Sequence, residues 1–320
     1  MLEIQNYYDK YRNIRMKVLV TGGYGLVGKA LQNKNNRYIY IGSEYDLRIE
    51  SEVLRLFEKY NPDVVIHLAN VVSGLYNNIN NNYSILIDNV KMNINILEMC
   101  KRFKIKRLIG ILSTCVFGNN VDYPLTSSQI LKDGCDESNE GYGTSKRLLY
   151  TGSKLLSKTS DIEIVSLIPT NLYGFEDNYN LEKSHVIPGL IMKMYISGKD
   201  SVIIKGTGES KRQFVFANDF AEIIEHFVDC TLSKKYNELI VSDNVESEIT
   251  IKELVNKISK ELNYKGEIKY DKTYSNGQLR KTASEKELLE YIPNFKFTNL
   301  DKGLKETVNY FLKNYESIRK

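Results

Sequence analysis

The sequence contains no tryptophan, three histidines, four cysteines and no long apolar run among its 320 residues. His67, His185 and His226 have no metal-ligand spacing, so metal hydrolysis has no support and no bound metal is expected. The cysteines have neither paired spacing nor a secretory leader before them, which predicts reduced thiols and a cytoplasmic location. No stretch approaches the roughly 20 apolar residues of a membrane span, so no membrane association is expected.

A run of one charge sign is also missing. The net charge of +4 comes from Lys and Glu interspersed along the chain, which argues against nucleic acid as a partner. The composition is 42% hydrophobic and 26% charged, with no low-complexity block beyond an asparagine-rich patch at residues 77–82, so the chain is expected to be globular. Residues 1–15 are polar and tyrosine-rich and are interpreted as an N-terminal extension.

Spaced glycines follow a short apolar run at residues 18–20, and an apolar helix start follows the glycines. Such a run is typical of a strand that crossover helices bury on both faces. Gly22 permits the sharp turn, Gly25 lets a pyrophosphate approach the backbone, and Gly28 lets the helix pack closely on the strand. The helix N–H groups then face the phosphates. The pattern predicts a dinucleotide site, with an ordinary glycine-rich turn as the alternative.

The second expected strand, at residues 37–41, is followed by the residues that usually contact the adenosine ribose. An NAD site places a carboxylate about 20 residues past the first glycine, and Glu44 is close to that place. The sequence does not place Glu44 clearly enough for us to expect that it repels a 2′-phosphate. Arg48, which could attract one, lies nearby. We therefore expect a modest preference for NADPH over NADH.

A fourth expected strand, at residues 108–112, delivers Ser113 and Cys115 at its carboxyl end, where the chemistry of open parallel sheets takes place. Tyr142 and Lys146 lie four residues apart at the start of a helix, so both side chains project from one face. A phenol has a reference pKa of about 10, and a neighbouring ammonium favours its ionised form. With the glycine turn, these residues predict an acid-base site beside a bound dinucleotide; a chance surface pair is the alternative.

Alternating buried strands and helices predict an α/β fold, a Rossmann-type doubly wound parallel sheet with a smaller α/β substrate-binding lobe. Residues 83–103 read as a long helix with apolar side chains on more than one side, which one core face does not account for. We therefore expect a subunit contact there and a homodimer.

Six further stretches carry a resemblance to a known family. They lie at residues 112–117, 168–174, 184–190, 206–208, 212–214 and 276–284. With the glycine turn and the Tyr142 and Lys146 pair, they make the chain similar to the extended short-chain dehydrogenases/reductases, and within these to the GDP-L-fucose synthases. The resemblance runs from Lys17 to the C-terminus, and the stretches around His185 and up to Ser284 are the most specific.

The resemblance implies an NADPH-dependent enzyme that epimerises GDP-4-keto-6-deoxy-D-mannose at C3 and C5 and reduces its C4 ketone to give GDP-L-fucose. Ser113, Tyr142 and Lys146 match the reductase triad, and Cys115 and His185 match the base and the acid of the epimerisation. Inversion needs both groups, because a proton leaves one face of the sugar and another returns to the opposite face.

The resemblance also implies the binding residues and the domains. Positions that match NADP(H) contacts are Gly22, Gly25, Leu26, Val27, Gly28, Ser43, Asp46, Leu47, Leu68, Ala69, Tyr142, Lys146, Pro169, Asn171, Leu172 and His185. Positions that match GDP-sugar contacts are Ser113, Asn171, Lys193, Lys205, Arg212, Asn276 and Arg280, with Lys281 as the alternative to Arg280. We expect residues 16–172 and 212–244 to form the NADP-binding domain, and residues 173–211 and 245–320 the GDP-sugar-binding domain.

The chain departs from the family's pattern around the sugar nucleotide. Lys193 stands where many members have Arg, Lys205 where they have Trp, and Asn276 where Asp is common. The Lys at position 193 keeps the charge but loses bidentate diphosphate geometry. The substrate alternative is therefore a related GDP-sugar such as a 4-keto-heptose, reduced without epimerisation, although the presence of Cys115 and His185 argues against it. A non-enzymatic NADP-binding regulator is a further alternative, against which Tyr142 and Lys146 argue.

Overall fold

The computed structural model describes residues 16–72 and 74–320, so the expected N-terminal extension at residues 1–15 lies outside the described part. Six parallel strands form its central sheet. Their order across the sheet is β10 (Tyr236–Val241), β5 (Glu163–Pro169), β4 (Arg107–Ile111), β3 (Val64–His67), β1 (Val18–Thr21) and β2 (Ile39–Ile41). This doubly wound order reverses between β1 and β3, and it confirms the expected Rossmann-type sheet.

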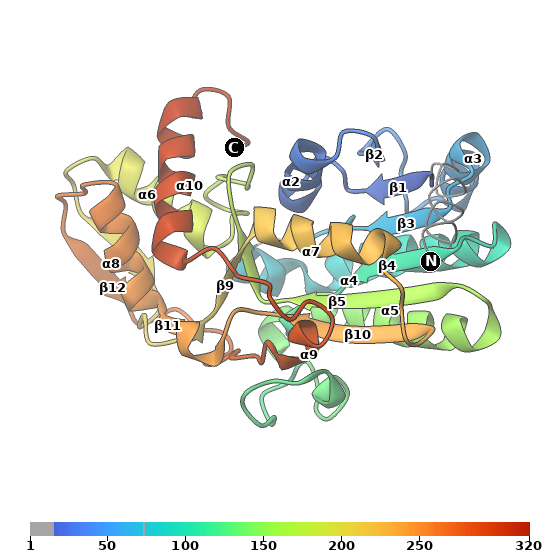
Figure 1. Cartoon of the computed structure of the whole chain (residues 1–320). Coiled ribbons are helices and arrows are strands. Elements are labelled where there is room, and N and C mark those ends of the chain that lie inside the picture. The colour runs from blue at the N-terminus through green and yellow to red at the C-terminus, as the bar shows by residue number, and fades with distance from the viewer. Residues whose placement is uncertain (1–15, 73) are drawn as a thin grey trace.

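Alternating side chains of β1 show how the sheet is buried on both faces. Val18 and Val20 pack into one hydrophobic cluster, while Leu19 between them packs into another. The first cluster includes residues of α2 (Leu26–Lys34) and α7 (Ala217–Asp229), and the second includes residues of α3 (Glu50–Tyr60), α4 (Leu75–Arg102) and α5 (Glu140–Thr159). Figure 1 shows α2 and α7 over one face of the sheet, as crossover helices require.

Helix α4 is longer than the expected helix at residues 83–103, because it takes in the asparagine-rich patch. The backbone of Asn81 departs from helical geometry, so the helix is kinked there. The turns before the kink lie beside residues 74 and 139, at the edge where the cavity described below opens. The patch is therefore structured and does not behave as a low-complexity linker.

His67 has the structural role expected for it. Its Nδ1 lies 2.8 Å from Thr21 Oγ1 and its Nε2 lies 3.1 Å from Asn93 Oδ1, and Asn93 donates to the Ser145 carbonyl at 3.0 Å. Burial, with the charge of Lys146, lowers the pKa of His67 to about 4, so the ring is neutral. This buried polar chain ties β1, β3, α4 and α5 together beneath the carboxyl edge of the sheet.

A second, smaller lobe has a hydrophobic core of its own. It packs α6 (Val186–Ser197), α8 (Ile251–Glu261) and α10 (Leu300–Asn314) against short strand pairs, and Figure 1 shows these helices gathered at one side of the sheet. The pairs are β7 (Val202–Lys205) with β12 (Ile268–Asp271), β8 (Lys211–Arg212) with β11 (Ile249–Thr250), and β6 (Asn171–Tyr173) with β9 (Phe214–Phe216). The short helix α9 (Lys286–Leu289) packs on β10. Helix α8 opens with the expected capping box, in which Thr250 Oγ1 accepts from the Glu253 N–H at 3.1 Å and Glu253 accepts from the Thr250 N–H at 2.7 Å.

Two expected absences can be examined only within the part of the chain that the structure describes. There, no helix combines the length and the apolar character that crossing a bilayer requires. In the same residues, no group of three or more His, Cys, Asp or Glu side chains is arranged to hold a metal ion.

Candidate active site

A cavity of about 1330 Å³ lies between the carboxyl edge of the central sheet and the smaller lobe. Nearly every residue expected at the site lines it, from the glycine turn to the basic residues of the smaller lobe. The lining includes Gly22, Gly25, Leu26, Val27, Gly28, Ser43, Asp46, Leu47, Leu68, Ala69, Ser113, Cys115, Tyr142, Lys146, Pro169, Asn171, Leu172, His185, Lys193, Lys205, Arg212 and Asn276. Arg280 is not among the lining residues.

The glycine turn has the shape that a pyrophosphate needs. A Cβ on Gly22, whose φ is +67°, would lie 2.7 Å from the Ala69 nitrogen, and a Cβ on Gly28 would lie 2.3 Å from a backbone oxygen, so both positions are closed by packing. A Cβ on Gly25 would meet only one atom, at 3.5 Å, because this glycine faces open space. Helix α2 begins there without a side-chain cap, which leaves its first N–H groups for an anion. These residues fit a bound dinucleotide.

The charged side chains near the adenosine end of the cavity already have hydrogen-bond or ion-pair partners within the protein. Glu44 accepts a hydrogen bond from the Gly42 N–H at 2.9 Å. Arg48 forms ion pairs with Asp46 at 2.7 Å and Asp88 at 3.3 Å, and its hydrogen bonds lower the pKa of Asp46 to about 2. Glu44 is therefore turned onto its own loop, and Arg48 is partly neutralised.

The expected reductase residues come together at the end of β4 and the start of α5. Ser113 caps the short helix at residues 114–116, and its Oγ accepts from the Cys115 N–H at 3.2 Å. Tyr142 is 6% exposed and Lys146 is 1% exposed. The Lys146 Nζ donates to the Ile111 carbonyl at 2.8 Å and lies 5.6 Å from the centre of the Tyr142 ring.

The electrostatics of this pair differ from the sequence expectation. We expected Lys146 to favour ionised Tyr142, but burial dominates and raises the pKa of Tyr142; the charge of Cys115 also raises it, and a hydrogen bond with Ser113 only partly opposes the rise. Burial likewise lowers the pKa of Lys146 to about 7. The phenol therefore stays protonated, which suits a proton donor.

The buried Lys146 should cost stability in the protein without ligands. Its pKa falls from an ordinary 10.5 to about 7, so between these values the unfolded chain binds more protons and the free energy of unfolding rises with pH. We expect Lys146→Met to raise the free energy of unfolding by about 1–3 kcal/mol near pH 6, and by less near pH 9. Urea titrations at both pH values measure this difference. A variant that is less stable than the wild type near pH 6 would contradict it.

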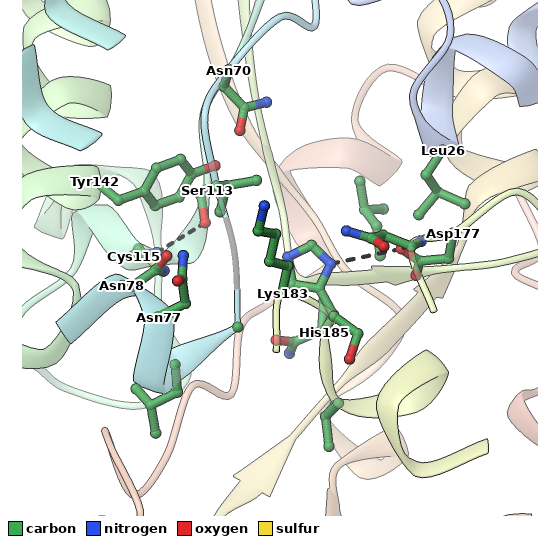
Figure 2. Close-up of a pocket in the computed structure, with 18 of the residues that line it drawn as sticks. Leu26, Asn70, Asn77, Asn78, Ser113, Cys115, Tyr142, Asp177, Lys183 and His185 are labelled. Carbon is green, nitrogen blue, oxygen red and sulfur yellow. Dashed lines mark hydrogen bonds and ion pairs between the residues drawn. The ribbon is translucent and has the colours of Figure 1, made fainter. Parts of the chain in front are cut away.

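Cys115 and His185 lie on different sides of the cavity (Figure 2), Cys115 beside Ser113 and Tyr142, and His185 beside Asp177. The His185 Nδ1 lies 3.9 Å from the Oδ1 of Asp177, whose carboxylate is buried. Desolvation opposes the imidazolium, but the Asp177 carboxylate outweighs it and raises the pKa of His185, although 46% of the His185 side chain is exposed. His185 is thus poised to give a proton.

The cations of the smaller lobe surround the far end of the cavity. Burial, and then the charge of Lys205, lowers the pKa of Lys193, and burial lowers the pKa of Arg212. The Lys205 Nζ lies 4.6 Å from the centre of the Tyr274 ring. Asn276 Oδ1 accepts from the N–H of Thr207 at 2.8 Å, so this amide orders the loop that borders the cavity. Lys193 and Lys205 are close enough for their charges to interact, and two such cations fit a diphosphate.

The structure separates the two candidates at positions 280 and 281. Arg280 Nε donates to Glu248 at 2.9 Å and to Thr282 at 2.7 Å, away from the cavity. Lys281 lines the cavity, and its Nζ lies 3.3 Å from Cys115 Sγ. Consecutive residues of an extended segment point to opposite sides, so only one of the two can reach the site.

Sequence reasoning missed other lining residues. Asp177 and the asparagines Asn77 and Asn78 line the cavity, and Arg319 from the C-terminal end joins them. The only sequence signal for the asparagines was an unusual composition, and nothing in the spacing indicated that Asp177 lies beside His185.

The fold and the site together define a dinucleotide-dependent enzyme of the extended short-chain dehydrogenase/reductase type. Residues 18–237 match the model of the NAD dependent epimerase/dehydratase family. The GDP-L-fucose synthase of Dictyostelium discoideum is 36% identical over 95% of this chain and 97% of its own length, and the GDP-L-colitose synthase of Yersinia pseudotuberculosis is 33% identical over 93% and 98%. The crystal structure of a GDP-L-fucose synthetase from Naegleria fowleri bound to NADP superposes with a TM-score of 0.87 at 35% identity, covering 95% of each chain. The chain therefore belongs to the NAD dependent epimerase/dehydratase family, among the GDP-L-fucose synthases.

Proposed function

We propose that this enzyme uses NADPH to convert GDP-4-keto-6-deoxy-D-mannose to GDP-L-fucose, by epimerisation at C3 and C5 and reduction at C4. The observation that carries the proposal is that Cys115 and His185 line the same cavity as Ser113, Tyr142 and Lys146. A base, an acid on the opposite side and a reductase triad are the groups that this pair of reactions needs. The relatives at 33–36% identity include GDP-L-fucose and GDP-L-colitose synthases.

In the epimerisation, the Cys115 thiolate takes the proton from C3 or C5, so that the C–H bond breaks and an S–H bond forms. The electron pair moves onto the C4 oxygen, where the Ser113 and Tyr142 hydroxyls stabilise the enolate. His185 then delivers a proton to the opposite face, because it lies on a different side of the cavity from Cys115. The proton that Asp177 keeps on the imidazole makes His185 the acid.

In the reduction, the same hydroxyls act on the same oxygen. When bound, NADPH supplies the hydride for C4. Tyr142 gives its phenolic proton to the C4 oxygen while Ser113 donates a hydrogen bond to it. Lys146, at the bottom of the cavity, is the residue expected to hold the nicotinamide ribose.

The preference for NADPH over NADH is proposed to be modest. Arg48 is near enough to the adenosine end to attract a 2′-phosphate, but it already pairs with Asp46 and Asp88. The Glu44 carboxylate accepts a hydrogen bond from the Gly42 N–H of its own loop, and Glu44 does not line the cavity.

We propose the domain limits given above, and we also propose that the protein is located in the cytoplasm. The separate core of the smaller lobe supports the first. The four cysteines, all of which are free thiols, support the second.

We also propose a two-fold homodimer through α4 and α5. The two helices pack side by side, and large apolar side chains remain exposed on them: Tyr83 at 79%, Ile94 at 41% and Leu155 at 56%. Sedimentation velocity at micromolar concentration is expected to give twice the chain mass of 36.9 kDa, and Leu155→Asp is expected to release monomers. A wild-type protein that sediments as a monomer would refute the dimer.

The substrate test is NADPH oxidation with GDP-4-keto-6-deoxy-D-mannose, followed at 340 nm. We expect turnover with this sugar and little with the corresponding UDP-4-keto-6-deoxyglucose, because the relatives of this chain are synthases of GDP-sugars, GDP-L-fucose and GDP-L-colitose. Equal turnover with both would reject the GDP-sugar assignment. Reduction of a 4-keto-heptose without epimerisation is the runner-up, and the placement of both Cys115 and His185 in the cavity disfavours it.

A further inference from the structure

The ammonium group of Lys281 contacts the sulfur of Cys115. The Lys281 Nζ lies 3.3 Å from Cys115 Sγ, and the Lys281 residue is only 7% exposed. A buried lysine normally pairs with a carboxylate or an array of carbonyls. Here the ammonium donates its hydrogen bond to the Cys115 sulfur.

The backbone around Lys281 is fixed from both sides. Immediately after it, the carbonyl of Thr282 accepts from the Leu125 N–H at 2.8 Å, and the N–H of Ala283 donates to the Gln213 side chain at 2.7 Å. Before it, the Gln278 side chain donates to the Gly118 carbonyl at 2.7 Å. The ammonium is thus held beside the sulfur by the fold, and the contact does not depend on a flexible surface chain.

Charged and titratable groups face Cys115 from three elements. Lys146 and Tyr142 face it from α5, Arg212 from β8 and Lys281 from the segment before α9. Cys135 also interacts with it.

Two carboxylates also act on this set: Asp136 interacts with both Lys281 and Arg212, and Glu248 interacts with Arg212. Burial would raise the pKa of Asp136, but hydrogen bonds from Ser138 and Asn119 and the charge of Lys281 lower it. The Asp136 oxygens therefore accept hydrogen bonds from Ser138 and Asn119 and not from the Lys281 ammonium. The cations Lys281 and Arg212 remain the main charges around the sulfur.

We propose that Lys281 is a positioning residue that holds Cys115 as the thiolate required for proton abstraction. The proposal rests on the proposed epimerase function. When Cys115 takes a proton from the sugar, the sulfur loses its negative charge while Lys281 stays protonated, and the thiolate is restored when that proton leaves to solvent. Lys281 itself exchanges no proton with the sugar.

A second role for Lys281 would be to bind the diphosphate of the sugar nucleotide. The two roles differ in the protein without ligands. A residue that stabilises the thiolate changes the reactivity of Cys115 even when the cavity is empty of substrate, because the thiolate is the nucleophile. A residue that binds the diphosphate changes only the KM.

The test is the alkylation rate of Cys115 by iodoacetamide between about pH 6 and pH 10, followed by peptide mass spectrometry in the absence of NADPH and sugar. We expect Lys281→Met to slow the reaction about tenfold near pH 7.5. Lys281→Arg, which keeps the charge, should retain the wild-type profile. Lys211→Met, which removes a cation outside the cavity, should also retain it.

The wild-type protein gives an internal comparison that needs no variant. Burial raises the pKa of Cys230, whose thiol lies away from the cavity, so Cys115 should react faster than Cys230 near pH 7.5. An unchanged alkylation profile in Lys281→Met, an equal loss in Lys281→Met and Lys281→Arg, or a wild-type Cys115 slower than Cys230 would each overturn the proposal. Incorporation of solvent deuterium at C3 and C5 by the wild type tests the proposed function separately. If the wild type exchanges deuterium while Lys281→Met is alkylated normally, only the role of Lys281 fails.

Discussion

Cys115→Ser and His185→Gln are each expected to suppress incorporation of solvent deuterium at C3 and C5 of the 4-keto sugar by about 10²–10⁴-fold, in an assay without NADPH. A serine hydroxyl does not ionise near neutral pH, whereas a cysteine beside the Lys281 ammonium can supply a thiolate as the base. Glutamine keeps the size of the histidine side chain but carries no acidic proton. Mass spectrometry or NMR of the sugar measures the exchange.

The matched control for this prediction is Cys230→Ser. Cys230 does not line the cavity, so its variant should exchange deuterium at the wild-type rate. NADP+ affinity, measured on the same samples, shows whether the dinucleotide half of the cavity is intact. Exchange at the wild-type rate in both Cys115→Ser and His185→Gln would remove the epimerase assignment and favour the reductase without epimerisation.

Tyr142→Phe is expected to abolish NADPH oxidation, with a loss of at least about 10²–10⁴-fold, because the proton donor to the C4 oxygen is removed. The phenol is 6% exposed and burial keeps it protonated, so solvent cannot easily replace it. Deuterium exchange should fall less than NADPH oxidation, since Ser113 still stabilises the enolate and Cys115 and His185 are unchanged.

Tyr150→Phe is the control for this variant, because Tyr150 lies two turns further along α5 and is also buried. It should oxidise NADPH at close to the wild-type rate. If Tyr142→Phe retained most of its NADPH oxidation, another group would have to be the proton donor, and the assignment of the triad would be wrong.

The sheet and the dinucleotide turn could be predicted from the sequence because their signals are local. Packing closes the positions of Gly22 and Gly28 to a Cβ, as expected, while Gly25 faces open space, where the pyrophosphate is expected to lie. Tyr142 and Lys146 are similar, since a spacing of four on a helix places both side chains on one face. Cys115 lies two residues after Ser113 at the end of a strand, so the two were expected to lie close together.

Contacts between distant segments could not be predicted in this way. Lys281 meets Cys115 across 166 positions of sequence, and no spacing rule relates them. Arg280 and Lys281 were equivalent candidates until the structure showed that Glu248 holds the first outside the cavity. The asparagine-rich patch suggested only a biased composition, whereas its residues begin α4 and line the site.

The pKa of Tyr142 shows a different limit. The sequence places a cation near the phenol, but it does not give the depth of burial of either group. In the structure both are buried, and the cost of burying charge shifts each towards its neutral form. The sign of the shift therefore depends on packing, which spacing alone does not reveal.

The most direct test of the account is the product that the wild-type enzyme forms from GDP-4-keto-6-deoxy-D-mannose and NADPH in deuterated water. If one cavity performs both reactions, the product is GDP-L-fucose with deuterium at C3 and C5. A reduced GDP-sugar with the original configuration and no deuterium at either carbon would contradict the account, because Cys115 and His185 would then have no part in the chemistry.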